Sequence, residues 1–180
     1  MTEELEILRD ITTRLDCLRL PFMLTGSVAM NHYAVPRMTR DIDLVILLPA
    51  GRVHSFVRSL EPDYMIAEEA VVSAVGHSSM FNAIHMESVV KVDFVCLKEH
   101  PFRHEEFARR RRVKIDGFET WIVSREDLIL SKLLWARDSG SERQHADIRN
   151  LLGDACDMAY LEQWAPRLGV DEDFEKLRSA

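Results

Sequence analysis

One short segment, residues 41–48, constrains the fold of this chain more than any other, because acidic and apolar side chains alternate along it. Side chains on a β-strand point to opposite faces in turn, so Asp41 and Asp43 share a face and lie about 7 Å apart. The other face is apolar and predicts a core formed by Ile42, Leu44, Ile46 and Leu48. Two like charges at that spacing repel by about 2 kcal/mol in an effective dielectric near 20, and a divalent cation or a nearby arginine would remove the repulsion.

A second predicted strand, residues 89–97, carries one more acid, Asp93, on the same face as Lys91. If this strand pairs with the strand of Asp41, three carboxylates converge. Carboxylate oxygens are hard ligands of the kind that magnesium selects, usually together with substrate phosphates. Two such ions can clamp the attacking and leaving oxygens of an in-line phosphoryl displacement. The alternative is that Asp93 is a surface residue beside Lys91.

A glycine and a serine, Gly26 and Ser27, lie between a short predicted strand, residues 22–25, and a predicted helix that ends at Tyr33. Glycine lets the backbone approach a phosphate closely, and the first N–H groups of a helix attract an anion. The pair is therefore a candidate phosphate-binding turn. A plain connection between strand and helix is the alternative.

The remaining segments predict an α/β (α+β) chain. Apolar residues at spacings of three and four predict helices, alternating runs predict strands, and the pair Asp116-Gly117 is a strong hairpin signal. The further predicted helices cover residues 3–20, 52–60, 68–75 and 102–109, and the further predicted strands cover residues 81–86, 111–115 and 119–123. This order predicts a mixed β-sheet with flanking helices over residues 1–124 and a C-terminal helical extension over residues 125–180.

Composition excludes several other classes of protein. The 180 residues have a net charge of −7, which argues against a strongly basic nucleic-acid clamp. The three cysteines form no C-x-x-C pair, and the pair His100 and His104 lacks a third zinc ligand. The acidic start has no signal-peptide pattern, and the apolar runs are too short to span a bilayer. A reduced, cytoplasmic protein without a membrane partner is predicted.

These elements resemble, in type and in order, the nucleotidyltransferase superfamily related to DNA polymerase β. Its first motif is an apolar residue, then Gly, then Gly or Ser. A strand with the pattern acid-x-acid follows later, and an isolated Asp lies on a further strand. The corresponding residues here are Gly26-Ser27, Asp41-Ile42-Asp43 and Asp93. Thr25 departs from the pattern, because an apolar residue usually stands before the glycine.

The finer pattern resembles the small prokaryotic minimal nucleotidyltransferases, including the AbiEii-like group of toxin–antitoxin systems, over residues 20–152. The segments that carry this resemblance are Arg37-x-Thr39-x-Asp41-Ile42-Asp43, Phe81-Asn82-x-Ile84-His85, Lys91-Val92-Asp93-Phe94, Glu126-Asp127-Leu128 with Lys132-Leu133, and Asp147-Ile148. Gln144 stands where AbiEii-like proteins often have an Asp.

The resemblance implies a catalytic role for the three acids and a phosphate-binding role for the turn. Asp41 and Asp43 would hold Mg²⁺ (or Mn²⁺) and the triphosphate. Asp93 would hold a second ion or take the proton from the acceptor hydroxyl. Gly26, through its backbone, and Ser27 would bind the phosphates of an NTP.

Three further residues are implied at the nucleotide or the acceptor. Arg37 would bind the nucleotide or neutralise the carboxylates. Lys132 would reach the triphosphate, with a solvated helix position as the alternative, and Asp147 would orient Lys132 or the acceptor. The reaction would be transfer of a nucleoside monophosphate with release of pyrophosphate, which depends mainly on positioning and charge neutralisation.

The sequence leaves three classes of acceptor possible: tRNA, a protein and a small hydroxylated molecule. It also does not indicate which NTP is the substrate. The basic run Arg109–Arg112 is a candidate contact for RNA phosphates, although a solvated helix end is favoured. The resemblance also implies a toxin-like role, with an antitoxin or helical protein as partner. The alternatives are a catalytically silent module that binds nucleotide or a partner, and an interaction protein in which the acids are incidental.

Overall fold

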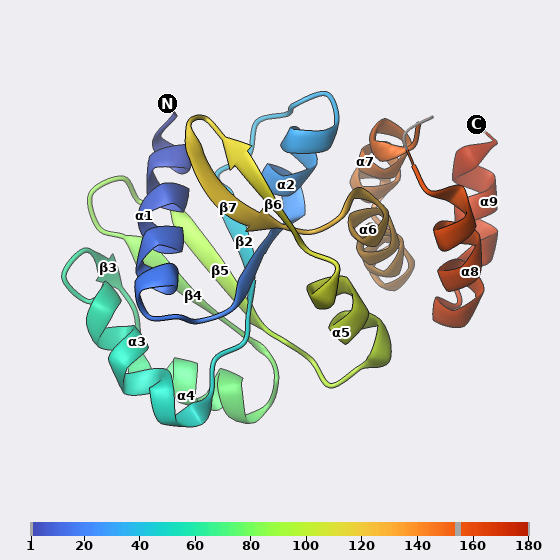
Figure 1. Cartoon of the computed structure of the whole chain (residues 1–180). Coiled ribbons are helices and arrows are strands. Elements are labelled where there is room, and N and C mark those ends of the chain that lie inside the picture. Colours follow the sequence, from blue (N-terminus) through green and yellow to red (C-terminus); the bar gives the residue numbers. More distant parts are fainter. Residues whose placement is uncertain (1, 154–155, 180) are drawn as a thin grey trace. The chain divides into compact units, whose positions relative to one another are not determined.

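The computed structural model describes residues 2–153 and 156–179, and these form two compact units (Figure 1). The first unit comprises the residues up to Ala29 together with Arg37–Val123. The second comprises Met30–Pro36 and the residues from Ser124 onward. The predicted division lies between residues 124 and 125, and it does not separate residues 30–36 from the sheet.

The first unit is built around a mixed sheet, which has seven strands within the described residues, in the order β3-β4-β5-β2-β1-β7-β6. β1 pairs with β7 in parallel and β2 with β5 in parallel, and the other pairs are antiparallel. The strands are β1 (Phe22–Thr25), β2 (Asp41–Ile46), β3 (Tyr64–Met65), β4 (Met80–His85), β5 (Lys91–Cys96), β6 (Arg111–Ile115) and β7 (Phe118–Ile122). The predicted α/β fold with a mixed sheet is confirmed.

Helices cover the apolar face of this sheet, and Figure 1 shows α1 lying over it. Phe56 of α3 makes edge-to-face contacts with Phe81 of β4 and Phe94 of β5, with ring centroids 5.8 and 5.4 Å apart. The predicted core face of β2 is buried, and Leu44 lies opposite Phe94 on it. The helices of this unit are α1 (Glu3–Cys17), α3 (Val53–Leu60), which follows a short 3-10 turn at Ala50–Arg52, α4 (Glu68–Gly76) and α5 (Pro101–Ala108).

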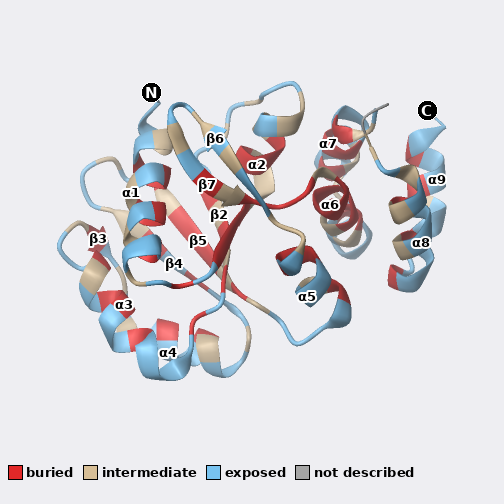
Figure 2. Ribbon diagram, viewed as in Figure 1, coloured by how far each residue is buried: buried red, intermediate tan, exposed pale blue. Residues whose placement is uncertain are grey.

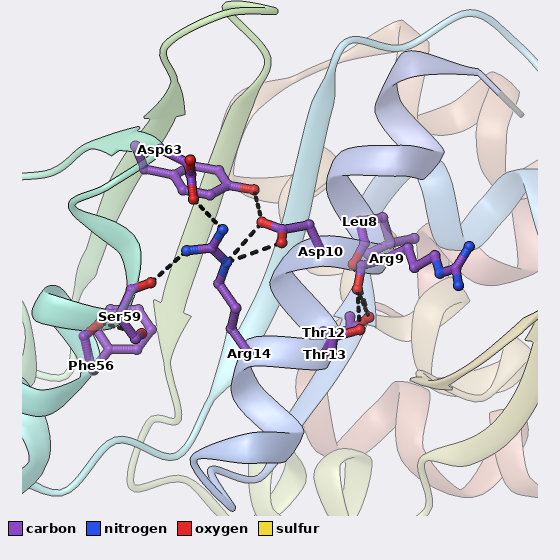
Figure 3. Close-up of polar contacts among 10 residues, drawn as sticks. Leu8, Arg9, Asp10, Thr12, Thr13, Arg14, Phe56, Ser59 and Asp63 are labelled. Carbon is purple, nitrogen blue, oxygen red and sulfur yellow. Dashed lines mark hydrogen bonds and ion pairs between the residues drawn. The ribbon is translucent and has the colours of Figure 1, made fainter.

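A cluster of polar contacts connects α1 to residues 59–64, which lead into β3 (Figure 3). Arg14 lies at its centre: Nε donates to both carboxylate oxygens of Asp10 at 3.1 and 2.9 Å, Nη1 donates to the carbonyl oxygen of Ser59 at 2.5 Å, and Nη2 pairs with Asp63. The hydroxyl of Tyr64 donates to Asp10 at 2.7 Å. Burial, reinforced by the bond to this carboxylate, raises the pKa of the Tyr64 phenol well above its usual value.

The second unit is helical throughout its described elements, and none of the described helices is long and apolar enough to cross a membrane. Its elements are α6 (Arg125–Ser139), α7 (Glu142–Leu151), α8 (Met158–Leu168), α9 (Asp171–Arg178) and the second half of α2 (Gly26–Tyr33). Ser124 caps α6 by accepting a hydrogen bond from the N–H of Asp127, and Gly140, with a φ of 64°, ends it. Figure 2 shows that α6 is buried along much of its length, as the central helix of the unit.

Backbone conformation at two turns explains why one predicted boundary is wrong and one predicted hairpin is confirmed. The helix predicted over residues 3–20 ends at Cys17, because Arg19 adopts a φ of 52° and the N–H of Leu20 turns back to a carbonyl of the last helical turn. The predicted hairpin at Asp116-Gly117 is confirmed, and both of its turn residues have positive φ, 44° and 95°. Two positive φ values are what a two-residue hairpin turn requires.

Candidate active site

The connection between β1 and α2 requires a glycine. Gly26 has a φ of 65°, a conformation that residues with a Cβ rarely adopt. A Cβ added to Gly26 would overlap the carboxylate of Asp43 and would lie 2.8 Å from its Cβ. The bare backbone of the turn therefore lies directly against one of the predicted metal-binding acids, and α2 begins there.

Asp43 and Asp93 lie next to each other on neighbouring strands. β2 and β5 run in parallel with Asp43 opposite Asp93 and Asp41 opposite Lys91. Opposite residues of adjacent strands point to the same face, with backbones about 4.8 Å apart. The expected pairing of these two strands is therefore present. Asp93 is buried, Asp43 is half-buried and Asp41 is exposed at the start of β2.

A lysine stands between two of the three acids. Nζ of Lys91 lies 2.8 Å from Oδ2 of Asp93 and 3.7 Å from Oδ1 of Asp41. The hydrogen bond to Asp93 raises the pKa of the Lys91 ammonium. The sequence placed Lys91 on the face of Asp93 but assigned it no site role. The strand alternation that identified the acids is the signal that could have identified their counter-ion.

The carboxylates suit a hard divalent cation, and one observation points the same way. Oδ1 of Asp93 is buried and has no hydrogen-bond partner among the described residues. A buried carboxylate oxygen without a partner is costly unless a cation or a donor offsets its lost hydration. In the described part of the chain, no group of three or more His, Cys, Asp or Glu side chains is arranged to hold a metal ion. The chemistry of the carboxylates therefore suits a cation, but the ammonium of Lys91 lies against Asp93 and near Asp41 in this arrangement.

Two predicted phosphate-binding residues contact each other. Nη2 of Arg37 donates to Oγ of Ser27 at 2.6 Å, although ten residues separate them along the chain. Ser27 lies in the first turn of α2, where N–H groups lack helical partners and attract anions. A guanidinium and a hydroxyl are thus held together at the turn that Gly26 forms.

Lys132 and Asp147 pair with each other inside the second unit. Nζ of Lys132 lies 2.7 Å from Oδ2 of Asp147 and donates to Oε1 of Gln144 at 3.1 Å. All three side chains are buried. The solvated position that was the alternative for Lys132 does not occur. The sequence singled out Gln144 only as a departure from the AbiEii-like pattern and did not predict its bond to Lys132. Its three-residue spacing from Asp147 on α7, which puts both side chains on one helix face, is the signal that could have indicated the bond.

The basic run at residues 109–112 is partly used by internal contacts. The guanidinium of Arg110 lies over the rings of Phe107 and Trp121, at 4.3 and 5.0 Å from their centroids. Arg112 pairs with Glu119 across the β6–β7 hairpin at 2.8 Å. These contacts assign two of the arginines to packing and pairing within the first unit.

The left-handed turn at Gly26 and the paired acids Asp43 and Asp93 follow the order of the nucleotidyltransferase motifs found in the sequence. Several solved structures share the fold. Among them are an antigenic nucleotidyltransferase-like protein from Paracoccidioides brasiliensis (20% identity, TM-score 0.57, covering 83% of this chain and 74% of that chain), the lincomycin-bound lincosamide antibiotic adenylyltransferase LnuA (17%, 0.55, 84% and 96%), and ANT(2'')-Ia in complex with adenylyl-2''-tobramycin (18%, 0.56, 99% and 96%). At these identities the likeness shows the fold alone.

The chain belongs to the family described as nucleotidyltransferase of unknown function (DUF6036), whose model matches residues 1–174. No curated protein sequence matches the chain. The family and the fold together confirm the nucleotidyltransferase class that the sequence motifs predicted.

Proposed function

We propose that this protein transfers a nucleoside monophosphate from an NTP to a hydroxyl acceptor, with Mg²⁺ or Mn²⁺ as cofactor. The observation that carries the proposal is the register of Asp43 and Asp93 beside the left-handed turn at Gly26. This register supports the proposal, because acids that can hold a cation then lie next to a backbone that a phosphate can approach. An NTP substrate agrees with the cytoplasmic location that the sequence predicts.

The candidate site residues of the first unit then divide between binding phosphates, holding the cation and accepting a proton. The N–H groups at the start of α2, the hydroxyl of Ser27 and the guanidinium of Arg37 bind and orient the phosphates. Asp41, Asp43 and Asp93 would hold the cation, which when bound neutralises phosphate charge and aligns the reacting oxygens. The acceptor oxygen forms a bond to the α-phosphorus as the bond from that phosphorus to the bridging oxygen of pyrophosphate breaks. Asp93 takes the proton of the acceptor hydroxyl, and pyrophosphate leaves with the electron pair.

The helical unit contributes two residues whose roles stay predictions. Lys132 is assigned to the triphosphate by the family resemblance, and Asp147 holds its ammonium at 2.7 Å. Asp147 is therefore well placed to orient Lys132, which is one of the two roles that the sequence left open for it. A role in acceptor binding would need Asp147 to leave a buried ion pair.

For the acceptor, we favour a small hydroxylated molecule over tRNA or a protein. Two proteins of the same fold have been solved with small molecules of this kind: a lincosamide antibiotic adenylyltransferase with lincomycin, and ANT(2'')-Ia with adenylyl-2''-tobramycin. The internal contacts of Arg110 and Arg112 also engage two arginines of the basic run within the protein, which disfavours an RNA backbone as their partner. The toxin-like role, with an antitoxin as partner, stays a prediction.

Label transfer tests the proposal. The protein is incubated with each α-labelled NTP, Mg²⁺ and a cell extract. Label is followed into the acceptor, and release of pyrophosphate is measured separately. We expect Asp43→Asn and Asp93→Asn to lower transfer by about 100-fold or more, because each removes charge that the transition state requires. Glu119→Gln, the same kind of change on β7, should transfer at the parental rate. Tight binding of Mg²⁺–NTP without any transfer would favour the silent binding module instead.

A further inference from the structure

Four polar side chains form a row across the sheet. Thr25 of β1 lies opposite Asp43 of β2, Asp43 lies opposite Asp93 of β5, and Asp93 lies opposite Asn82 of β4. Opposite residues share a face, so all four point to the side of the sheet away from the α1–α3 core. We call these four residues the polar row.

The polar row has apolar neighbours along its strands. A second row lies two residues away on each strand, in the direction in which β2 and β5 run. It consists of Met23, Val45, Val95 and Met80. On the other side, Ile84 lies opposite Lys91. Binding sites for small molecules commonly place a few polar groups in such apolar surroundings. The face can therefore accept a ring with an apolar side and polar substituents.

The two ends of the polar row differ. Thr25 leads directly into Gly26 and the start of α2, which is the proposed phosphate end. Asn82 lies at the opposite end and is exposed. β3 pairs with β4 through Tyr64 and Met65, opposite His85 and Ile84, and this pairing does not extend to Asn82. The end of the row at Asn82 is therefore open to a second substrate.

The side-chain amide of Asn82 has no structural role among the described residues. Its side chain makes no hydrogen bond with the described residues, although it stands one strand away from the buried carboxylate of Asp93. A side-chain amide both donates and accepts, which suits a neutral hydroxyl group. The acids of the row would repel an anionic acceptor.

We propose that Asn82 positions the acceptor by binding an uncharged, hydroxyl-bearing part of it beside Asp93, at the end of the polar row away from the phosphates. This rests on the proposed nucleotidyl transfer and adds the direction of approach. The neighbours Met80 and Ile84 contact the apolar side of the acceptor. The acceptor is a neutral hydroxylated small molecule, and its reacting hydroxyl lies between Asn82 and the α-phosphate.

The test separates nucleotide binding from acceptor binding. Calorimetry with Mg²⁺ and an α,β-methylene NTP analogue measures nucleotide affinity. Transfer of α-label is then measured against increasing amounts of the small-molecule fraction of a cell extract. For Asn82→Ala we expect about a tenfold rise in the half-saturating amount of that fraction, because one hydrogen bond to the acceptor is lost. Nucleotide affinity should stay within about twofold of the parent.

Three further variants make the result specific. Asn82→Ser keeps a donor and an acceptor and should recover most of the loss. Ser27→Ala should do the reverse, weakening nucleotide binding while leaving the acceptor dependence unchanged. Ser73→Ala, an exposed position on α4, should match the parent in both measurements.

The outcomes distinguish the two proposals. If the parent binds nucleotide but transfers no label, the proposed function fails and the role of Asn82 with it. If the parent transfers label but Asn82→Ala has parental acceptor dependence, or weakens nucleotide binding equally, only the role of Asn82 is overturned. Label that enters the macromolecular fraction, rather than the small-molecule fraction, overturns the proposed acceptor class.

Discussion

At the scale of single residues, Gly26 is the position where backbone conformation and site geometry meet. In Gly26→Ala the new side chain must adopt a left-handed φ and push against Asp43. We expect the free energy of unfolding to fall by about 1–3 kcal/mol, and nucleotide affinity to fall with it. Urea denaturation and calorimetry measure the two effects. Gly51→Ala is the matched control, because a Cβ at Gly51 meets open space. Equal behaviour of the two variants would contradict the account of the turn.

Lys91 is the residue whose removal should reveal the cation site. In Lys91→Met the ammonium near Asp41 and Asp93 is lost, and the carboxylates are left to repel each other. We expect Mg²⁺ or Mn²⁺ without nucleotide to raise the melting temperature of this variant more than that of the parent, because the ion no longer competes with a fixed positive charge. Lys114→Met, an exposed change on β6, serves as control. A metal response equal to the parental one would show that Lys91 and the ion do not share a place.

Sequence reasoning finds residues of this site where one strand is enough to place them. The alternation of Asp41 and Asp43 predicts their common face, and burial of Leu44 and its neighbours on the other face bears this out. Asn82 could not be found in this way, because its relation to Asp93 depends on the register of two strands. Register is set by the whole sheet and is not contained in either segment alone.

At the scale of elements, the contact of α1 with β3 should depend on pH through Tyr64. Its phenol is held neutral by burial and by the bond to Asp10, so its folded pKa lies above the unfolded value of 10.0. The stability that Tyr64 contributes is therefore complete below about pH 10 and is lost as the pH rises further. Tyr64→Phe should be less stable than the parent by about 1–2 kcal/mol at pH 8. Denaturant unfolding at several pH values should show this difference shrinking above pH 10, and a constant difference would contradict the assignment.

The buried pair in the helical unit allows stability and function to be separated. Asp147→Ala removes the carboxylate that pairs with the buried ammonium of Lys132. We expect the free energy of unfolding to fall by about 3–5 kcal/mol. The double variant Lys132→Met with Asp147→Leu should recover most of this loss, because it removes both charges. Denaturant unfolding measures stability, and calorimetry on the stable double variant measures nucleotide affinity. If the double variant binds nucleotide as tightly as the parent, the predicted contact of Lys132 with the triphosphate is wrong.

Elements with a clear local signal were predictable, and those without one were not. The alternating runs and the Asp116-Gly117 turn predict strands and a hairpin that the structure contains. The two-residue strand β3 carries no periodicity, and its pairing with β4 is made by a distant part of the chain. Likewise, Arg19 ends α1 in a conformation that favours glycine, so no residue type marks that boundary.

At the scale of the whole molecule, α2 belongs to both units. It begins at Gly26 in the first unit, and its second half groups with the C-terminal helices. Two long-range contacts account for that grouping: Arg125 donates to the carbonyl oxygen of Tyr33 at 2.8 Å, and Asn150 bonds both backbone groups of Val35 at 3.0 and 3.3 Å. Partners about a hundred residues away cannot be inferred from local periodicity, so the sequence could not assign residues 30–36 to the helical unit.

Because α2 begins at the proposed phosphate site, we expect nucleotide binding to stabilise the helix beyond its first turn. Phosphates bound at its N-terminus would stabilise the helix from its first turn, because they satisfy N–H groups that lack helical partners. Hydrogen exchange followed by mass spectrometry should show slower amide exchange over residues 30–36 with Mg²⁺ and a non-hydrolysable NTP. Asn150→Ala should speed exchange over the same residues by about fivefold without nucleotide, as expected for loss of about 1 kcal/mol of hydrogen bonding, while β2 stays protected. Nucleotide that slows exchange at residues 26–29 but leaves residues 30–36 unchanged would show that the second half of α2 responds to the helical unit alone.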